Sequence, residues 1–284
     1  MPELPEVETI RRDLSQALLK KTIKEVEILD LPRVQPTKKL FVKKIKGLKV
    51  KEIIRVGKLL IFDLGKHQLL IHLKMTGQLV LKSKSKIVSG GHPVKGLVEL
   101  PNKFTRAIFY FSNKDILYFN DVRKFGYVKL VTTEELEKIK APYGVDPTGE
   151  EFTLKYFEDI LKKSERTILK HFLLRQHPIS GLGNIYVDEA CFRARVQPTR
   201  ILSSLTKKER KDLYQGIRRV LELSITKRGT SFNTYVGSDG ERGAFYKFLD
   251  VYGRGGKLCR RCKTPIKKSR VAGRGTHYCP NCQA

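Results

Sequence analysis

Four cysteines near the C-terminus constrain the fold of this chain more than any other feature. Cys259, Cys262, Cys279 and Cys282 form two CxxC pairs separated by 16 residues. Each CxxC turn presents two thiolates to one ion, and this spacing is typical of a closed, four-thiolate zinc ribbon. Disulfides are disfavoured in a chain that we expect to be cytosolic. We therefore predict one structural zinc ion with no open catalytic position, and we expect zinc to set the stability of so small a module.

The cysteine-rich segment is also strongly basic. Residues 252–284 contain no Asp or Glu. Within this segment Arg274 is flanked by two glycines, which predicts a tight hairpin tip that projects the guanidinium. His277 is close to the cysteines but is not needed as a ligand, and we interpret it as a surface or hairpin residue. The fifth cysteine, Cys191, stands in an apolar helical stretch and is interpreted as a small buried side chain.

The charge balance of the whole chain points to a polyanionic partner. Among 284 residues, 57 are Lys or Arg and 29 are Asp or Glu, for a formal net charge of +28. Basic side chains neutralise phosphates and release counterions, which favours nucleic acid. An anionic membrane surface and a basic protein with solvated lysine faces, such as a ribosomal protein, are the alternatives. No apolar run approaches the ~18 residues of a spanning helix, and the N-terminus lacks a signal-peptide pattern.

The chain opens with MPELPEVET, a segment with two possible roles. Loss of Met1 would leave Pro2 with a terminal secondary amine, which can attack a sugar aldehyde equivalent and form an iminium. This iminium cannot become a neutral imine, so it stays cationic and withdraws electrons from neighbouring carbon–oxygen bonds. Glu3 and Glu6 could supply general-acid and positioning functions. The structural alternative is that the prolines begin a helix. Helical spacing predicts an amphipathic helix in either case, through Val7, Ile10, Leu14 and Leu18.

The rest of the chain shows two patterns of apolar residues, first one typical of strands and then one typical of helices. From residue 22 to about 130, short alternating runs rich in β-branched and aromatic residues predict a β-sandwich or barrel. Hairpin turns are expected at 57–58 and 113–115, and a long loop over 83–103. From about residue 132 the pattern becomes helical.

Three segments of the helical half have recognisable local patterns. Thr206 and Glu209 form a capping box at the start of a long helix. In the segment ISGLGNIYVDEA, Asn184 is a predicted N-cap, at a helix start of the kind that binds phosphate; a simple helix–turn–helix bend is the alternative. The Gly-, Ser- and Thr-rich stretch 227–250 is predicted to be a mobile loop that could close over a ligand.

Taken together, these segments resemble formamidopyrimidine-DNA glycosylase, the bacterial base-excision enzyme for oxidised purines. The resemblance covers essentially the whole chain and is carried by MPELPEVET, RVGKLL, HLKMTG, NDVRKFG, GLGNIYVDEA, VYGRGG and GRGTHYCPNCQ. It implies an α+β fold in three parts. These are an N-terminal helix with a β-sandwich catalytic domain (1–131), a helix–two-turns–helix DNA-binding domain (132–258) with a lid at 227–243, and a four-cysteine zinc finger (259–284).

The resemblance also implies which residues carry the chemistry. Pro2 would be the nucleophile that attacks the anomeric carbon of the damaged nucleotide. Glu3 would assist protonation of the sugar ring, and Glu6 would orient the site and the N-terminus. Lys58 would contact phosphate and help acid chemistry near the lesion. Arg274 is assigned both to these catalytic residues and to the residues that contact DNA.

Other residues of the resemblance would bind and distort the duplex. An enzyme that acts on a base must take it out of the stack, which costs a few kcal/mol. An apolar wedge between base steps, with an arginine facing the orphaned base, offsets part of this cost. Met75, Arg123 and Phe125 resemble the side chains that enter the duplex. The implied phosphate contacts are His72, Asn184 and Arg274.

The resemblance implies a bifunctional DNA glycosylase and abasic-site lyase that excises 8-oxoguanine and formamidopyrimidines and cleaves the strand by β,δ-elimination. A monomer with one zinc ion is expected, in the bacterial cytoplasm with the nucleoid and without a membrane partner. One alternative is an endonuclease VIII-like enzyme for oxidised pyrimidines. That branch typically has Gly where this chain has Leu4, which favours purines. The other is a non-catalytic zinc protein that binds damaged DNA. The chain departs from the usual family residues at Lys74, Arg175 and Arg228, and in the segment NKFTR.

Overall fold

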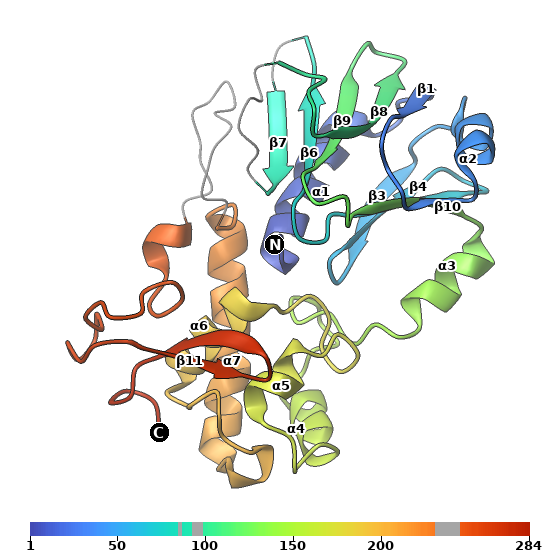
Figure 1. The fold of residues 1–284 in the computed structure, drawn as a ribbon. Helices are drawn as coiled ribbons and strands as arrows, with labels where there is room; N and C mark the ends of the chain where they lie inside the picture. The colour runs from blue at the N-terminus through green and yellow to red at the C-terminus, as the bar shows by residue number, and fades with distance from the viewer. Residues whose placement is uncertain (85–86, 93–98, 231–244) are drawn as a thin grey trace. The chain divides into compact units, whose positions relative to one another are not determined.

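The computed structural model describes residues 1–84, 87–92, 99–230 and 245–284 (Figure 1). The chain divides into two compact units. The first comprises 1–141 with 227–244, and the second comprises 142–226 with 245–284. The predicted fold class is confirmed: an N-terminal helix with a β-sandwich, a helical part, and a C-terminal four-cysteine module.

The first unit is built on two five-stranded sheets. One sheet has the order β1-β8-β9-β6-β7 and is antiparallel throughout. Its strands are β1 (Ile23–Ile28), β6 (Gly77–Lys82), β7 (Ile87–Gly91), β8 (Thr105–Phe111) and β9 (Ile116–Asp121). The other has the order β2-β10-β5-β4-β3, with only the β2–β10 pair parallel. Its strands are β2 (Val34–Gln35), β3 (Glu52–Val56), β4 (Leu59–Asp63), β5 (Gln68–His72) and β10 (Tyr127–Val131).

Alternation along the strands places apolar side chains on both faces of the second sheet. In β4, Leu60 and Phe62 join the main core, to which strands of both sheets contribute. Leu59 and Ile61 point to the opposite face, where they pack with Leu136 of α3 (Thr133–Lys140). Because successive side chains of a strand point to opposite faces, a near-continuous apolar run marks a strand that is covered on both sides.

Helix α1 (Leu4–Leu18) confirms the amphipathic N-terminal helix, since Val7, Ile10, Leu14 and Leu18 are all buried. The helix contacts β3 and β7, the edge strands of the two sheets. The approach to β7 is close: a Cβ on Gly90 would lie 2.2 Å from Cγ1 of Ile10. Glycine at position 90 is therefore what lets the helix sit against this edge.

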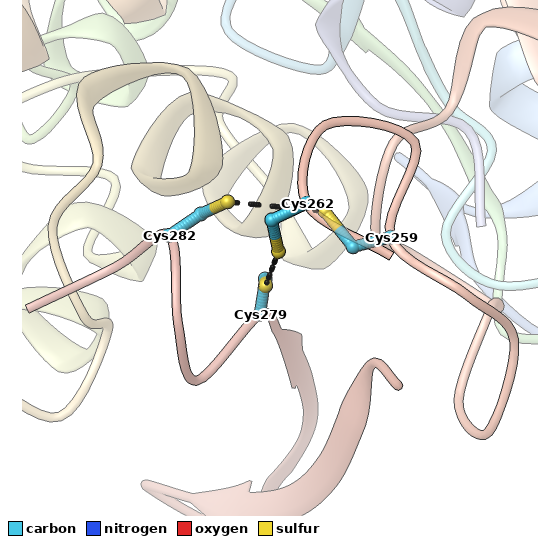
Figure 2. Close-up of side chains that lie close together, drawn as sticks. All are labelled: Cys259, Cys262, Cys279 and Cys282. Atoms are coloured by element: carbon cyan, nitrogen blue, oxygen red, sulfur yellow. Dashed lines mark hydrogen bonds between the residues drawn. The ribbon is translucent and has the colours of Figure 1, made fainter. Parts of the chain in front are cut away.

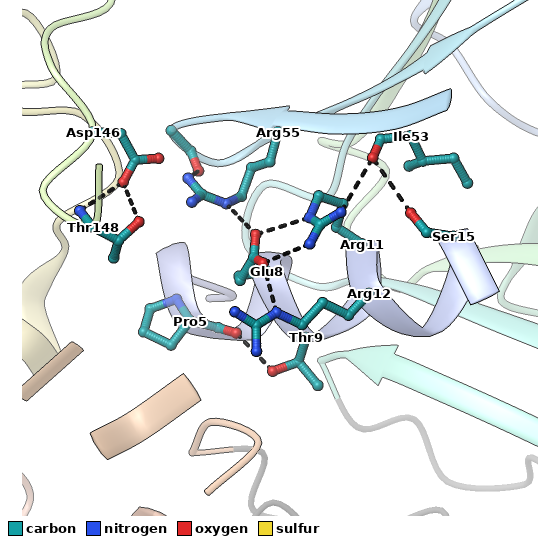
Figure 3. Close-up of polar contacts among 11 residues, drawn as sticks. Pro5, Glu8, Thr9, Arg11, Arg12, Ser15, Ile53, Arg55, Asp146 and Thr148 are labelled. Atoms are coloured by element: carbon teal, nitrogen blue, oxygen red, sulfur yellow. Dashed lines mark hydrogen bonds and ion pairs between the residues drawn. The ribbon is translucent and has the colours of Figure 1, made fainter. Parts of the chain in front are cut away.

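An ion cluster around the largely buried carboxylate of Glu8 fastens α1 to β3 (Figure 3). The carboxylate of Glu8 accepts hydrogen bonds from Arg11 and Arg12 of its own helix and from Nε of Arg55 in β3. Burial alone would raise the pKa of Glu8, but the bonds from Arg11 and Arg12 and the charge of Arg55 outweigh it and lower the pKa to about 2. The cluster therefore remains ionised across the physiological range.

The structure differs from the predicted loop over 83–103. Strand β7 lies inside that segment and pairs with β6 from Lys82↔Ile87 to Gln78↔Gly91. Its glycines and serine suggest a loop, but pairing at the sheet edge determines the conformation, as is common for strands. Strands β2 and β6 and helix α2 (Lys38–Ile45) are further elements that the sequence analysis did not single out.

The second unit is mainly helical. Its longest helix, α7 (Lys207–Thr226), is capped by reciprocal bonds between Thr206 and Glu209, as predicted. Leu213, Ile217, Val220 and Leu221 form the buried face of this helix, which packs on α6 (Asn184–Ala194). The helices are α4 (Leu154–Lys162), α5 (Leu169–Leu174), α6 (Asn184–Ala194) and α7 (Lys207–Thr226), with short 3-10 turns at Leu202–Ser204 and Phe245–Phe248. The hairpin is β11 (Lys267–Val271) with β12 (Arg274–Tyr278). Among the described residues, no helix has the length and apolar content needed to cross a bilayer.

Candidate functional site

The N-terminal turn of α1 is buried and tightly hydrogen-bonded. Pro2 is buried and directly precedes Glu3, the N-cap residue. The backbone N–H of Glu3 donates to Oε2 of Glu6 at 2.9 Å. Pro5 lies in the first turn, where a missing N–H leaves no intrahelical bond unmade. The sequence therefore places a proline at position 2 in a fixed setting, directly before a first helical turn that carries Glu3 as its N-cap and Glu6 three residues later.

Glu6 also holds a segment from the other end of this unit. Its Oε1 accepts hydrogen bonds from the backbone N of Thr230 at 2.8 Å and from Oγ1 of Thr230 at 2.9 Å. The structure describes residues 227–230 but not 231–244, so most of the predicted lid, 227–243, lies outside the described residues. Before Thr230, Arg228 has φ +60° and ion-pairs with Asp13 at 2.6 Å.

Lys58 occupies the two-residue turn between β3 and β4, as the hairpin prediction required. The flanking residues Val56 and Leu59 pair across the turn, and Gly57 has φ +56°. The Lys58 side chain is largely buried. The next residue, Leu59, pairs with His72 of β5, which brings the turn next to that histidine.

His72 is held in one neutral form. Burial, and then the charges of Lys74 and Lys58, lower the pKa of His72 to about 3. Its Nδ1 accepts a hydrogen bond from the backbone N of Lys74 at 2.9 Å, which leaves the proton on Nε2. At neutral pH His72 is therefore an uncharged donor beside two cations.

Two neighbouring crossovers between the sheets carry the predicted wedge residues. Met75 lies between β5 and β6, and Arg123 and Phe125 lie between β9 and β10. The crossovers are adjacent because Gly77 pairs with Asp121 at one end and His72 with Tyr127 at the other. The Phe125 side chain is 39% exposed, and the Arg123 guanidinium lies 4.5 Å from its ring centroid. Exposure on a crossover argues against a core role for Phe125.

In the second unit, Asn184 does not cap α6. Gly183 is the N-cap in an extended conformation, and Asn184 is the first helical residue. The Asn184 side chain instead donates from Nδ2 to the carbonyl of Gly275 at 2.8 Å. The N-cap prediction is therefore wrong, because Gly183 adopts the cap conformation. The side-chain amide of Asn184 instead bonds the β11–β12 hairpin at Gly275.

The hairpin that carries Arg274 is anchored by a buried ion pair. Lys170 and Asp188 are both 0% exposed, with Nζ and Oδ1 separated by 2.6 Å. Lys170 also donates to the carbonyl of Gly275 at 3.0 Å, and Oδ2 of Asp188 accepts from the backbone N of His277 at 2.8 Å. His277 is thus a hairpin residue, as predicted, but a buried one.

Arg274 is exposed beside the hairpin turn. The turn itself is made by Ala272 and Gly273, with φ +49° and +72°, and Arg274 is the first residue of β12. The predicted tip with a glycine on each side of Arg274 is therefore shifted by one position. Gly275 lies within the strand, where its carbonyl accepts the bonds from Lys170 and Asn184.

The four cysteines meet in one cluster (Figure 2). Their sulfur atoms all lie within 4.8 Å of one another, with separations of 3.9 Å for Cys259–Cys282 and 3.4 Å for Cys262–Cys279. Zinc–thiolate bonds of about 2.3 Å in a tetrahedron place sulfurs about 3.8 Å apart, so the donor set fits a structural zinc ion. Cys191 is separate and fully buried, as predicted, and burial raises the pKa of its thiol.

Sequence analysis did not identify several residues that organise these sites. Thr230 and His92 carry no local pattern that marks them, and Asp121 was given no role although it lies within the motif NDVRKFG. Burial, and then the charge of the chain's N-terminus, lower the pKa of His92. Lys170 and Asp188 did leave a signal, since each is a charged residue within an apolar helical run.

Family models match three consecutive segments of the chain. The formamidopyrimidine-DNA glycosylase N-terminal domain matches residues 1–128, and the formamidopyrimidine-DNA glycosylase H2TH domain matches 143–236. A zinc finger found in FPG and IleRS matches 256–284.

Full-length relatives agree with these matches. The chain is 41% identical over 286 residues to formamidopyrimidine-DNA glycosylase of Carboxydothermus hydrogenoformans, with 100% of both chains covered. It is 38% identical over 286 residues to the Streptococcus mutans protein of the same name, covering 100% of this chain and 99% of the other. Among solved structures, a complex of Lactococcus lactis Fpg with DNA containing an abasic site matches with a TM-score of 0.87 at 35% identity, covering 99% of each chain.

The β-sandwich with its N-terminal helix, the helical unit and the four-cysteine module define a DNA glycosylase of the class that carries a zinc finger. The matches extend over the full length of the chain and of its relatives. The chain belongs to the formamidopyrimidine-DNA glycosylase family of DNA-repair enzymes.

Proposed function

We propose that this protein is a bifunctional DNA glycosylase and abasic-site lyase that removes oxidised purines from duplex DNA. The observation that carries the proposal is the setting of Pro2. It is buried, it directly precedes the N-cap of α1, and the carboxylate that follows it one turn later binds both Glu3 and Thr230. A chain that lost Met1 would present a secondary amine from this fixed position.

The proposed chemistry uses that amine twice. The nitrogen of Pro2 attacks C1′, the glycosidic bond breaks, and its electron pair leaves with the base, which takes up the proton that the Pro2 nitrogen gives up. Glu3 protonates the ring oxygen so that the sugar opens to the cationic iminium. Loss of a proton from C2′ then expels the 3′ phosphate, and a second elimination expels the 5′ phosphate. Glu6 orients the N-terminus during these steps, and Lys58 contacts phosphate and assists acid chemistry.

DNA contacts are assigned to both units. In the first, His72 donates to a phosphate from Nε2 without adding charge, and Met75, Arg123 and Phe125 enter the stack when the damaged nucleotide leaves it. In the second, Asn184 and Arg274 contact phosphates. The hydrogen bonds of Asn184 and Lys170 to Gly275, next to Arg274, support this assignment because they fix the strand that carries the guanidinium.

Zinc would be held by Cys259, Cys262, Cys279 and Cys282. Its role is to stabilise the module that presents Arg274, and no reaction step depends on it. The proposal keeps 1–131 as the catalytic domain, 132–258 as the DNA-binding domain and 259–284 as the zinc finger. A monomer that associates with the bacterial nucleoid in the cytoplasm is proposed, because chromosomal DNA is the substrate and the relatives are bacterial proteins.

The test is a comparison of duplexes that differ only in the lesion. Duplexes with 8-oxoguanine, thymine glycol or an intact guanine are incubated with the protein, and the strand ends are analysed by mass. The proposal expects fastest cleavage at 8-oxoguanine, with phosphates left on both sides of a one-nucleotide gap. Faster cleavage at thymine glycol would favour the oxidised-pyrimidine branch, and tight binding without cleavage would favour a non-catalytic damage-binding protein.

A further inference from the structure

One buried carboxylate lies where the two wedge-bearing crossovers meet. Asp121 is the last residue of β9 and is 0% exposed. It pairs with Gly77, the first residue of β6, so it lies directly between the turn that carries Met75 and the segment that carries Arg123 and Phe125. None of the roles assigned above uses this side chain.

The Asp121 carboxylate accepts hydrogen bonds from both crossovers. Oδ1 accepts from Oγ1 of Thr76, the residue after Met75, and from the backbone N of Arg123 at 3.2 Å. Oδ2 accepts from the backbone N of Gly126 at 2.7 Å. Thr76 closes the arrangement, because its Oγ1 also accepts from the backbone N of Arg123 at 3.0 Å. Each wedge residue therefore lies at or next to a position bound by this pair.

Residues around the Asp121 carboxylate allow its close contacts and support its position. A Cβ on Gly126 would lie 3.0 Å from Oδ2 of Asp121 and 2.5 Å from Cζ of Phe119, so glycine is needed for the close N–H approach. The backbone carbonyl of Asp121 accepts from Nε of Arg106 at 2.7 Å. Arg106 in turn contacts Asp30, which binds Lys124 on the same crossover. The crossover between β9 and β10 is thus held by hydrogen bonds or an ion pair at Asp121, Arg123, Lys124 and Gly126.

We propose that Asp121, acting through Thr76, is a positioning residue that locks the two crossovers into one arrangement, so that Met75, Arg123 and Phe125 enter the duplex as a unit. The proposal rests on the proposed function, since it concerns how the wedge is presented. Three donors converge on one buried carboxylate, and two of them are backbone N–H groups of the crossover itself. Loss of the carboxylate would free the crossovers to move separately, and entry into the stack would become slower.

The test uses Asp121→Asn and Thr76→Val, which keep the side-chain volume. The amide of Asn cannot accept all three donors, and Val lacks the hydroxyl that joins the crossovers. Two substrates separate presentation of the wedge from chemistry: a duplex with 8-oxoguanine, and a single-stranded oligonucleotide with a pre-formed abasic site. The second needs the amine chemistry but no invasion of a base stack. A 2-aminopurine placed opposite the lesion reports entry of the wedge by stopped-flow fluorescence.

We expect both variants to lose about tenfold in duplex excision, since each leaves buried donors or acceptors unsatisfied. The fluorescence step should slow by the same factor, and cleavage of the single-stranded abasic site should stay within about twofold of the parent protein, because that reaction needs no wedge. Thr76→Ser restores the hydroxyl and should rescue the fluorescence step. Thr105→Val is the matched control, because Thr105 is a buried threonine in the same sheet whose hydroxyl bonds Asn120 and Asn102, which lie outside both crossovers.

Two outcomes overturn the inference. Equal losses on both substrates would assign Asp121 a general structural role, and an unchanged fluorescence step in Thr76→Val would show that the crossovers do not depend on this bond. A parent protein that cleaves neither substrate would instead contradict the proposed function and would be recognised before any variant is compared.

Discussion

Glu6 and Thr230 are 224 positions apart in the chain and share two hydrogen bonds, both to the same carboxylate oxygen, Oε1. The other oxygen of Glu6 binds the backbone N–H of Glu3. One side chain thus connects the residue that follows Pro2 with the segment that leads out of α7. The Glu6 carboxylate therefore links Thr230 to the N-terminal turn, where the proposed nucleophile lies.

Thr230→Val tests this connection. The variant loses the hydroxyl donor but keeps the backbone N–H, so Glu6 becomes less constrained. Since hydrogen bonds to charged groups contribute roughly 1.5–3 kcal/mol, we expect single-turnover excision to slow by about tenfold or more. DNA affinity should change little, because no proposed DNA contact is lost. Thr9→Val is the control, since the Thr9 hydroxyl donates to the carbonyl of Pro5 within the same helix. Equal single-turnover excision rates for Thr230→Val and Thr9→Val would contradict a role of the Glu6–Thr230 hydrogen bonds in excision.

The Lys170–Asp188 pair predicts an unusually large effect on stability. Lys170→Met leaves Asp188 as an uncompensated buried charge, which costs about 3–5 kcal/mol in the free energy of unfolding. Denaturant titration measures this cost. In Lys170→Met with Asp188→Asn, the buried charge is gone and part of the loss should return. Lys208→Met breaks the exposed pair with Asp212 and should cost less than about 1 kcal/mol. Similar costs for the two lysine variants would contradict the assignment of a buried ion pair.

Because His72 is neutral, we predict that replacing it changes the affinity for DNA without changing how that affinity depends on salt. Because the pKa of His72 is about 3, the side chain contributes a donor but no charge at neutral pH. His72→Phe should weaken DNA binding and leave the slope of log K against log salt unchanged, whereas Arg274→Ala should reduce that slope by about 1. Equal changes in slope would mean that His72 is charged when DNA binds.

The same pKa predicts how stability depends on pH. Folding lowers the pKa of His72 from 6.5, so the unfolded chain binds more protons at this site below that value. The contribution of neutral His72 is therefore present above pH 6.5 and is lost as the pH falls from 6.5 toward about 3. The stability difference between the parent and His72→Phe should change in this window and stay constant between pH 7 and 8. A constant difference down to pH 4 would contradict the shift.

Zinc removal should affect the hairpin before the rest of the molecule. Cys262→Ser, or chelation of the parent protein, is expected to lower zinc content from one ion per chain and to weaken DNA binding together, because the metal stabilises the module that carries Arg274. Zinc is measured by atomic emission and affinity by fluorescence anisotropy. Cys191→Ala, which changes a cysteine outside the cluster, should keep the ion. A metal-free protein with full affinity would exclude the zinc module as a DNA-binding element.

Patterns within short segments predicted most of the fold. Alternation in β4 and the helical spacing of α1 each reflect burial of one or two faces, which is a property of a few consecutive residues. The capping box of Thr206 and Glu209 is equally local. Strand β7 was missed because its conformation depends on pairing with β6 at the sheet edge, and its own residues favour a turn.

The site was predictable where it depends on contiguous motifs. The zinc ligands, the N-terminal prolines and the crossovers all belong to short motifs in the sequence. The contacts that hold these motifs together join distant residues: Glu6 with Thr230, Thr76 with Asp121, and Lys170 with Asp188. Hydrogen bonds of this kind depend on the folded geometry, so spacing in a single sequence does not reveal them.

The account depends most directly on Pro2 as the nucleophile. Borohydride reduces an iminium, so the protein incubated with 8-oxoguanine duplex and borohydride should form a covalent adduct with DNA. Peptide mapping should place this adduct on Pro2 of a chain that has lost Met1. A variant that retains a blocked N-terminus should bind the duplex nearly as well and form no adduct. An adduct on Lys58 in the unblocked protein, or an adduct that persists when the terminus is blocked, would contradict the account.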